Sequence, residues 1–208
     1  FWPLLLGTSL FSSTTQVDQI MAASLLPGSI AALGFGSRVT ALVIAVAGVG
    51  VATSVLPAFS RLVADRDWPT LVRTLVQYGA IVVVLAALIS AVVVYFSEPL
   101  TGLLFERGNF TSGDTALVAR VQGYFALQLP FFLLSLVLVR LLSSLTMSRT
   151  VLVITAFNTV LNAVLNYVLM QQMGVAGIAL STTLVHLLST LLFAAAVATG
   201  LKARRSTA

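Results

Sequence analysis

Long apolar runs separated by short polar connections make up almost the whole chain. The runs cover residues 2–25, 30–59, 71–96, 117–142, 151–170 and 175–200. A helix needs ~20 mainly apolar residues to cross the hydrocarbon of a bilayer. A membrane-spanning β-strand would instead alternate apolar and polar residues over ~10 positions, because its two faces meet different surroundings. The pattern therefore predicts an all-α integral membrane protein with about six transmembrane helices.

The connections between these runs are short, so residues 1–208 are predicted to form a single transmembrane lobe. Only the stretch 97–115 is long enough to hold further structure, and we expect a short interfacial helix around PLTGLLF followed by a Gly/Asn/Ser turn. Asp114 lies near the start of the fourth run, where a carboxylate stabilises a helix N-terminus. Pro57 and Pro130 are expected to kink or end their helices.

The composition excludes several classes of protein. Hydrophobic residues make up 59% of the chain and charged residues only 8%, whereas soluble domains carry about 25% charged residues. The absence of cysteine excludes disulfides and thiolate metal sites. No nucleophile motif, phosphate-binding loop or metal-ligand cluster stands in the sequence, so we predict neither an enzyme nor a bound cofactor.

The basic residues predict the orientation in the membrane. One side carries Arg61, Arg66, Arg73, Arg149, Lys202, Arg204 and Arg205, and the other carries Arg107 and Arg120 with Glu98, Glu106 and Asp114. The positive-inside rule places the first group in the cytoplasm, with both ends of the chain, and the 97–115 connection outside. The net charge of +5 thus reflects topology, and no nucleic-acid partner is expected. The chain opens on FWPLLL, without a signal peptide, which indicates a piece of a longer protein.

Arg38 stands inside the second apolar run, in the stretch GFGSRV. It lies ~12 Å along its helix, and an arginine at a helix centre costs ~2.5–3.5 kcal/mol on insertion scales. Asp18 lies about as far before the turn at Pro27 as Arg38 lies after it, so antiparallel helices place both at a similar depth. Two interpretations stay open: the pair is neutralised for folding, or both line a wet cavity where Arg38 binds an anion such as phosphate.

Two helix faces carry further polar residues. Thr8, Ser12, Gln16 and Gln19 follow one face of the first run at spacings of four, four and three. Asn158, Asn162 and Asn166 follow one face of the fifth run, where they either form hydrogen bonds between helices or contribute to a substrate groove. His186 stands alone in an apolar helix and is interpreted as a packed or hydrogen-bonded side chain.

Four blocks in order resemble one family. VDQIMAASLLPGSIAALGFGSRV, VATSVLPAFSRL, LLFERGNFTSGDT and LNYVLMQQMGVAGIALSTTL are similar to the MurJ/MviN lipid II flippases, within the superfamily of multidrug, oligosaccharidyl-lipid and polysaccharide exporters. That family has two six-helix lobes facing a central cavity, commonly with two more helices. The resemblance implies the second lobe of an exporter-type flippase, so the first lobe would be a partner missing from this chain.

The resemblance implies a function and a set of site residues. The family moves lipid II, a polyprenyl-diphosphate-linked disaccharide peptide, from the cytoplasmic to the outer face of the bacterial inner membrane by alternating access. Arg38 occupies the position of a cavity arginine associated with the diphosphate, and Asp18 matches a frequent acidic position. With the polar faces of the first and fifth runs, the candidate substrate-binding residues are Arg38, Asp18, Gln16, Ser12, Asn158 and Asn162.

Other functions stay compatible with the sequence. The nearest alternative keeps the fold and moves another lipid-linked oligosaccharide, such as an O-antigen or exopolysaccharide unit. A multidrug antiporter would bind cations that Arg38 repels, and a membrane scaffold would need a larger charged tail than KARRSTA. The energy source, membrane potential or a coupling ion, is not specified by the sequence.

Overall fold

A computed structural model describes residues 14–106 and 110–205, and the described residues contain helices and no strand. Residues 14–23 are helical and lead through a turn into the rest of the bundle. The following helices are α2 (Ser29–Ala64), α3 (Trp68–Tyr95), α4 (Ser97–Phe105), α5 (Ser112–Ala126), α6 (Leu129–Ser144), α7 (Ser148–Met173) and α8 (Val175–Arg205). The predicted all-α class is confirmed. Thr8 and Ser12 lie outside the described residues.

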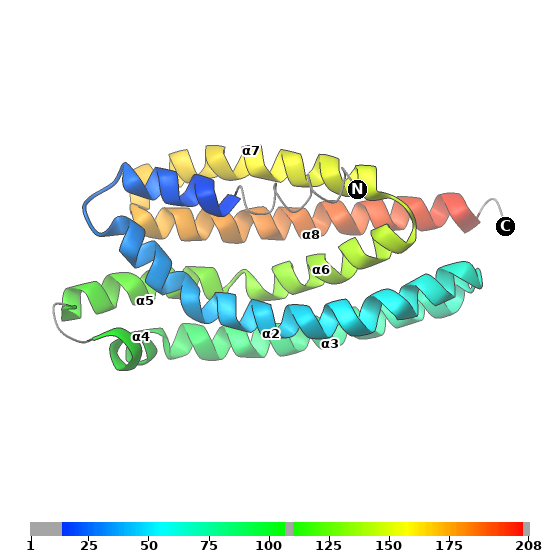
Figure 1. The fold of residues 1–208 in the computed structure, drawn as a ribbon, viewed down its shortest axis with the longest axis horizontal. Coiled ribbons are helices and arrows are strands. Elements are labelled where there is room, and N and C mark those ends of the chain that lie inside the picture. The colour runs from blue at the N-terminus through cyan, green and yellow to red at the C-terminus, as the bar shows by residue number, and fades with distance from the viewer. Residues whose placement is uncertain (1–13, 107–109, 206–208) are drawn as a thin grey trace.

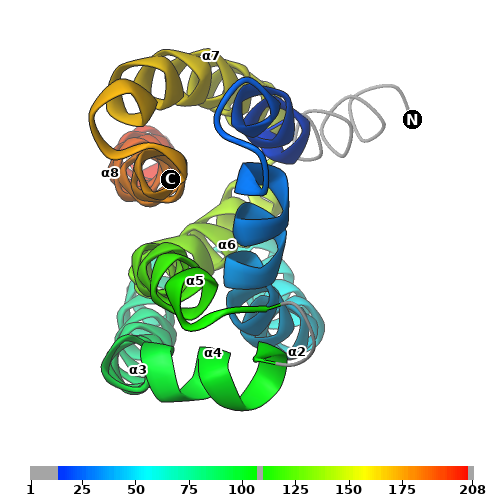
Figure 2. The same cartoon turned by 90° about the vertical axis from the view of Figure 1, so that its left-hand side faces the viewer.

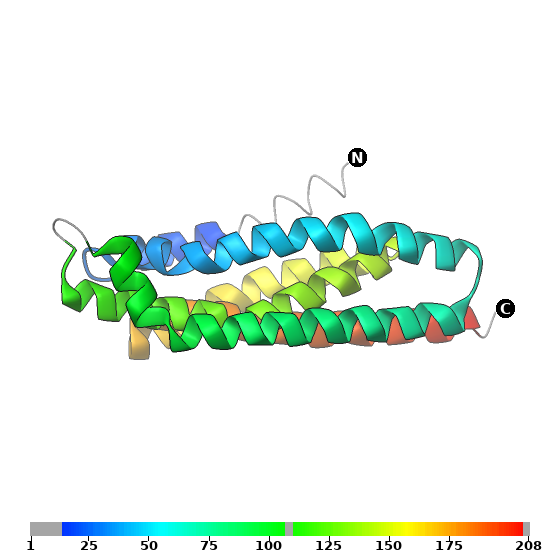
Figure 3. The same cartoon turned by 90° about the horizontal axis from the view of Figure 1, so that it is seen from below.

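The long helices run side by side as an elongated bundle (Figure 1). The α2–α3 turn, the α6–α7 connection and the end of α8 share one end, while the turn before α2, α4 and the α7–α8 turn share the other (Figures 1 and 3). Seen from the second end, α7, α8 and residues 14–23 lie on one side, and α3, α4 and α5 lie on the other (Figure 2). α6 lies between them and packs against α2, α3 and α8.

Five helical stretches in the described part of the chain are long and apolar enough to cross a membrane, with α5 and α6 taken as one stretch. The sixth predicted span, residues 2–25, is described only from residue 14. Exposed apolar side chains line the outer surfaces of α3 and α7, including Ile81, Leu85, Leu88, Val92, Val153, Val160 and Val164. Such faces suit contact with lipid, which offers no competing polar groups.

The fourth predicted span lies within one stretch able to cross a membrane, Ser112–Ser144, and it is broken at Pro130, one of the two prolines expected to kink or end a helix. Residues 127 and 128 form a turn that separates α5 from α6, and Pro130 stands in the first turn of α6. Proline has no amide hydrogen, so it cannot donate to the carbonyl of Ala126 four residues earlier. The Ser90 hydroxyl of α3 donates to that carbonyl instead, at 2.8 Å. Pro57, by contrast, lies inside α2 without ending it.

The second end of the bundle carries α4, so the prediction of a short helix around PLTGLLF is confirmed, and its place at the membrane interface stays a prediction. α5 begins at a capping box in which Thr111 and Asp114 each bond the other's backbone, so the predicted capping role of Asp114 is confirmed. At the opposite end Asp67 caps α3 by accepting from the amide of Thr70 at 3.1 Å. The hydrogen bonds from Thr70 hold the pKa of Asp67 below its ordinary value.

Candidate functional site

Arg38 lies on an exposed face of α2. Its guanidinium carbon lies 5.0 Å from the ring centroid of Phe35, one turn earlier on the same helix. Within the described residues the only ion pair joins Arg61 to Asp65, and no hydrogen bond is found for the Arg38 guanidinium. A guanidinium has five N–H donors in its plane. Arg38 therefore presents a permanent charge and unused donors inside a membrane helix.

Asp18 is buried and does not pair with Arg38. One carboxylate oxygen accepts from Asn166 Nδ2 at 2.6 Å, and the other accepts from Thr182 Oγ1 at 3.2 Å. Both partners belong to the α7–α8 pair. A shared depth along antiparallel helices was therefore not enough to bring Asp18 and Arg38 together, because their side chains leave their helices in different directions.

The asparagine face of α7 points into the lobe. Asn158, Asn162 and Asn166 are all buried, the last two completely. Asn166 donates to Asn162 Oδ1 at 3.3 Å and accepts a short hydrogen bond from Ser181 of α8. These contacts join α7, α8 and Asp18 into one interior polar cluster. Asn166 thus bonds Asp18 and Ser181 outside its own helix, which is the first of the two roles expected from the sequence, whereas the buried Oδ1 of Asn158 has no hydrogen-bond partner among the described residues.

The cluster contains a single charged group, the Asp18 carboxylate. No group of three or more His, Cys, Asp or Glu in the described ranges could hold a metal ion. The other oxygen atoms beside Asp18 that could ligate a cation are the amide oxygen of Asn162 and the hydroxyl oxygen of Thr182. Oxygen donors with one negative charge suit a proton or a hard cation and do not suit a soft transition metal.

A cavity of about 270 Å³ borders this cluster, and we call it the polar cavity for its polar residues, although apolar residues also line it. Its polar lining residues are Thr14, Thr15, Asp18, Gln19, Ser37, Thr40, Gln128, Asn162, Thr182 and His186. Thr40 Oγ1 and Asn162 Nδ2 are buried without a hydrogen-bond partner in the described part of the chain. A polar cavity of this size has room for several waters, since a water occupies about 30 Å³ in the liquid. His186 packs edge-on against Phe132, with 5.0 Å between the ring centroids.

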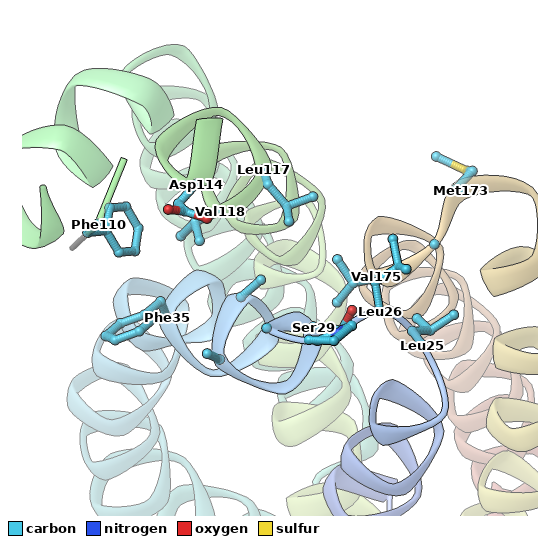
Figure 4. Close-up of a pocket in the computed structure, with 15 residues that line it drawn as sticks. Leu25, Leu26, Ser29, Phe35, Phe110, Asp114, Leu117, Val118, Met173 and Val175 are labelled. Carbon is cyan, nitrogen blue, oxygen red and sulfur yellow. The ribbon is translucent and has the colours of Figure 1, made fainter. Parts of the chain in front are cut away.

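A larger cavity of about 540 Å³ opens at the end of the bundle that carries α4. Figure 4 shows it between the turn before α2, the start of α5 and the α7–α8 turn. Its labelled lining includes the apolar residues Leu25, Leu26, Phe35, Phe110, Leu117, Val118, Met173 and Val175, with Asp114 among them. This cavity has a different chemistry from the polar one beside Asp18, and Phe35 connects it to Arg38.

The structure adds site residues that the sequence analysis did not single out. Phe35, three residues before Arg38, would follow from the rule that side chains one turn apart meet on a helix. Thr182 and Ser181 stand in the quoted block GIALSTTL, but only the tertiary arrangement shows that they meet Asp18 and Asn166. Gln16 is exposed and lines neither of these two cavities, and the described residues show no contact for it that would identify its role.

Replacing Asp18 by alanine is expected to destabilise the lobe. Alanine removes the acceptors of Asn166 and Thr182, and a buried donor left unpaired costs about 1–3 kcal/mol. Asp18→Asn should cost less, because its amide oxygen can still accept from Asn166 while its NH₂ donates to the Thr182 hydroxyl. The stability of both variants is measured by thermal unfolding of the purified protein in detergent. Equal unfolding midpoints for Asp18→Ala and the unmodified protein would show that the hydrogen bonds to Asp18 do not stabilise the lobe.

Comparison with known proteins adds a family to this geometry. A family model described as "Lipid II flippase MurJ" matches residues 1–203. A probable lipid II flippase MurJ from Synechocystis sp. is 30% identical over 172 residues, covering 82% of this chain and 32% of the relative. The chain thus spans about a third of the length of that relative.

Solved structures share the fold. A lipid II flippase MurJ in an inward closed conformation superposes with a TM-score of 0.80 at 23% identity, covering 95% of this chain and 42% of the other. An outward-facing multidrug resistance MATE family transporter of the MOP superfamily gives a TM-score of 0.80 at 21% identity, with 92% and 42% coverage. At these identities the superpositions establish the fold alone, which several transport functions share.

Proposed function

Because this chain belongs to the lipid II flippase MurJ family, as the match over residues 1–203 shows, we propose that it forms the second lobe of a two-lobe lipid II flippase. The family is one of transporters and not of enzymes. The chain is a multi-pass membrane protein with five described stretches able to cross a bilayer. The remaining length of the relatives leaves room for a first lobe facing this one.

The observation that carries this proposal is the exposed guanidinium of Arg38. It lies nine residues after the start of α2, about 14 Å along the helix. A charge at such a depth is costly unless it faces water, a ligand or another part of the protein. The absence of a carboxylate partner within the described ranges leaves its donors free for the two oxygens of a phosphate group.

The mechanism that we propose is alternating access between the two lobes. Arg38 holds the diphosphate of lipid II, while Gln16, and Ser12 in the part not described, meet the sugar or peptide. The polyprenyl tail stays in the membrane. The end of the bundle that carries Arg61, Arg66, Arg73, Arg149 and Lys202 faces the cytoplasm of a bacterial inner membrane, following the positive-inside rule.

We assign Asp18 to energy coupling, in place of the substrate contact expected from the sequence. Asp18 is buried between α7 and α8 and has hydrogen-bond partners on α7 and α8, so a large head group has no direct approach to it. The polar cavity beside it gives water, a proton or a hard cation a place next to the carboxylate. Asn162, which accepts from Asn166, then belongs to this interior cluster, and Asn158 remains a candidate substrate-binding residue.

A transport assay tests the proposal. The complete two-lobe protein is reconstituted in liposomes containing fluorescent lipid II, and a reagent outside the vesicles quenches the label that reaches the outer leaflet. We expect transport of lipid II above that of protein-free vesicles. A polyprenyl-diphosphate oligosaccharide without peptide serves as the competing cargo. If the protein transports the oligosaccharide lipid but not lipid II, the proposed cargo is wrong. If it transports neither lipid, the proposed flippase function is wrong.

A further inference from the structure

Three phenylalanines form an aromatic cluster beside Arg38. Phe35 of α2 lies 4.9 Å from Phe105 and 5.8 Å from Phe110, measured between ring centroids, and Phe105 and Phe110 lie 6.4 Å apart. The Phe35 and Phe110 rings meet edge to face at 86°. These distances fall in the range in which aromatic pairs attract one another. We call Phe35, Phe105 and Phe110 the outer aromatic cluster.

The cluster joins three separate parts of the chain. Phe35 belongs to α2, Phe105 is the last residue of α4, and Phe110 precedes the capping box of α5. Figure 4 shows the Phe110 ring next to Phe35 at the edge of the large apolar cavity. Phe35 is therefore packed against two rings that belong to other parts of the chain.

The contact with Phe35 has a particular consequence for anion binding. The Arg38 guanidinium carbon lies over the ring, and the ring offers no hydrogen-bond acceptor atom in competition with an anion. The ring therefore restricts the rotamers of Arg38, whose N–H donors stay without a hydrogen bond in the described residues. An arginine restrained in this way loses less conformational entropy when a phosphate binds to its edge.

We propose that Phe35 is a positioning residue for Arg38, held in place by Phe105 and Phe110, and that it orients the guanidinium toward a diphosphate. This inference rests on the proposed function, in which Arg38 binds the diphosphate of a lipid-linked substrate. Phe35 itself does not touch the phosphate. It acts through its contact with Arg38, whose guanidinium carbon lies over the ring at 5.0 Å from the centroid.

Substitutions at Phe35 distinguish the effect of its aromatic face from the effect of its apolar volume. Leucine keeps an apolar side chain but has no π face, whereas tyrosine and tryptophan keep the face. In the complete protein in detergent, we expect Phe35→Leu to weaken binding of undecaprenyl diphosphate by about 2- to 30-fold, the range that a cation–π contact provides. Phe35→Tyr and Phe35→Trp should bind as tightly as the unmodified protein. Undecaprenol, which lacks phosphate, measures the contribution of the tail.

A second background shows whether Phe35 acts through Arg38. With Arg38→Ala present, Phe35→Leu should cause no further loss, because the two residues work as a unit. An equal loss in both backgrounds would show a general structural effect and overturn the inference. The inference would also be overturned if Phe35→Trp weakened binding as much as Phe35→Leu does. Tryptophan keeps a π face, so such a result would show that a π face at this position does not maintain binding.

The same experiment distinguishes this inference from the proposed function. If Arg38→Ala weakens binding and Phe35→Leu does not, only the positioning role of Phe35 is wrong. If Arg38→Ala binds undecaprenyl diphosphate normally, both the positioning role and the proposed phosphate contact are wrong.

Two further variants serve as controls for replacing phenylalanine by leucine. Phe157→Leu makes the same change on the exposed surface of α7 and should leave affinity unchanged. Phe110→Leu removes one support of Phe35 without touching Arg38, and it should produce a smaller loss that also vanishes with Arg38→Ala. If Phe35→Leu does not reach the membrane, this second variant decides the question, and a normal affinity for it would overturn the inference.

Discussion

Arg38→Ala in the complete protein is expected to lower lipid II transport by about 100-fold or more. A bidentate guanidinium–phosphate contact supplies two charge-assisted hydrogen bonds, each contributing about 1.5–3 kcal/mol, and alanine removes both. Arg38→Lys should retain part of the activity, because lysine keeps the charge but cannot offer two donors in a fixed plane. The lysine should also lose the stacking over Phe35 in its present geometry.

Complementation in a strain depleted of its own flippase provides the measurement, together with the initial rate in the liposome assay. An immunoblot of the membrane fraction establishes that each variant is present in normal amount. Phe157→Leu on α7 is the control for an unrelated substitution. Normal growth and normal transport by abundant Arg38→Ala would exclude Arg38 as the phosphate contact.

Gly177→Ala should cause a large loss of stability in the lobe. Gly177 lies in the first turn of α8, against the end of α7, and a Cβ there would overlap the Leu169 carbonyl and lie 2.9 Å from the Met170 amide nitrogen. Backbone atoms cannot rotate away as a side chain can. The α7–α8 pair must therefore separate, at a cost of about 3 kcal/mol.

The effect is measured by thermal unfolding in detergent, with Gly123→Ala as the matched control. Nothing lies within 4 Å of the Cβ that alanine would place at Gly123, in α5. That substitution should leave stability unchanged or raise it slightly, since alanine favours the helix. An unfolding midpoint for Gly177→Ala equal to that of Gly123→Ala would show that the two helices do not pack so closely. Transport should fall with Gly177→Ala, because separation of α7 from α8 disrupts the hydrogen bonds to Asp18.

The hydrophobic pattern was sufficient to predict the helices, and the reason is physical. A chain in lipid must satisfy its backbone hydrogen bonds within each span, so a long apolar run leaves little choice but a helix. The break at residues 127 and 128 was expected only as a kink or an end at Pro130, because a proline within an apolar run is compatible with either. The partner of the carbonyl that Pro130 leaves free, Ser90, is distant in sequence and could not be predicted.

The candidate site was less predictable than the fold. The sequence indicated the depths of Asp18 and Arg38, which follow from the rise per residue. Their directions depend on how the helices rotate in the bundle, and this rotation turned Asp18 toward Asn166. The local neighbour Phe35 was within reach of sequence reasoning, whereas its contacts with Phe105 and Phe110 required the fold of the connection before α5.

The hydrogen bond from Ser90 to the Ala126 carbonyl bears on how the lobe is assembled during synthesis. The ribosome makes α3 before α5 and α6, so the Ser90 hydroxyl is already in the membrane when the carbonyl left free by Pro130 arrives. The exposed acceptor can thus be covered as soon as the broken helix leaves the translocon and meets α3. We therefore expect chain order to favour early pairing of the carbonyl that the broken helix leaves free, because its partner on α3 is made first.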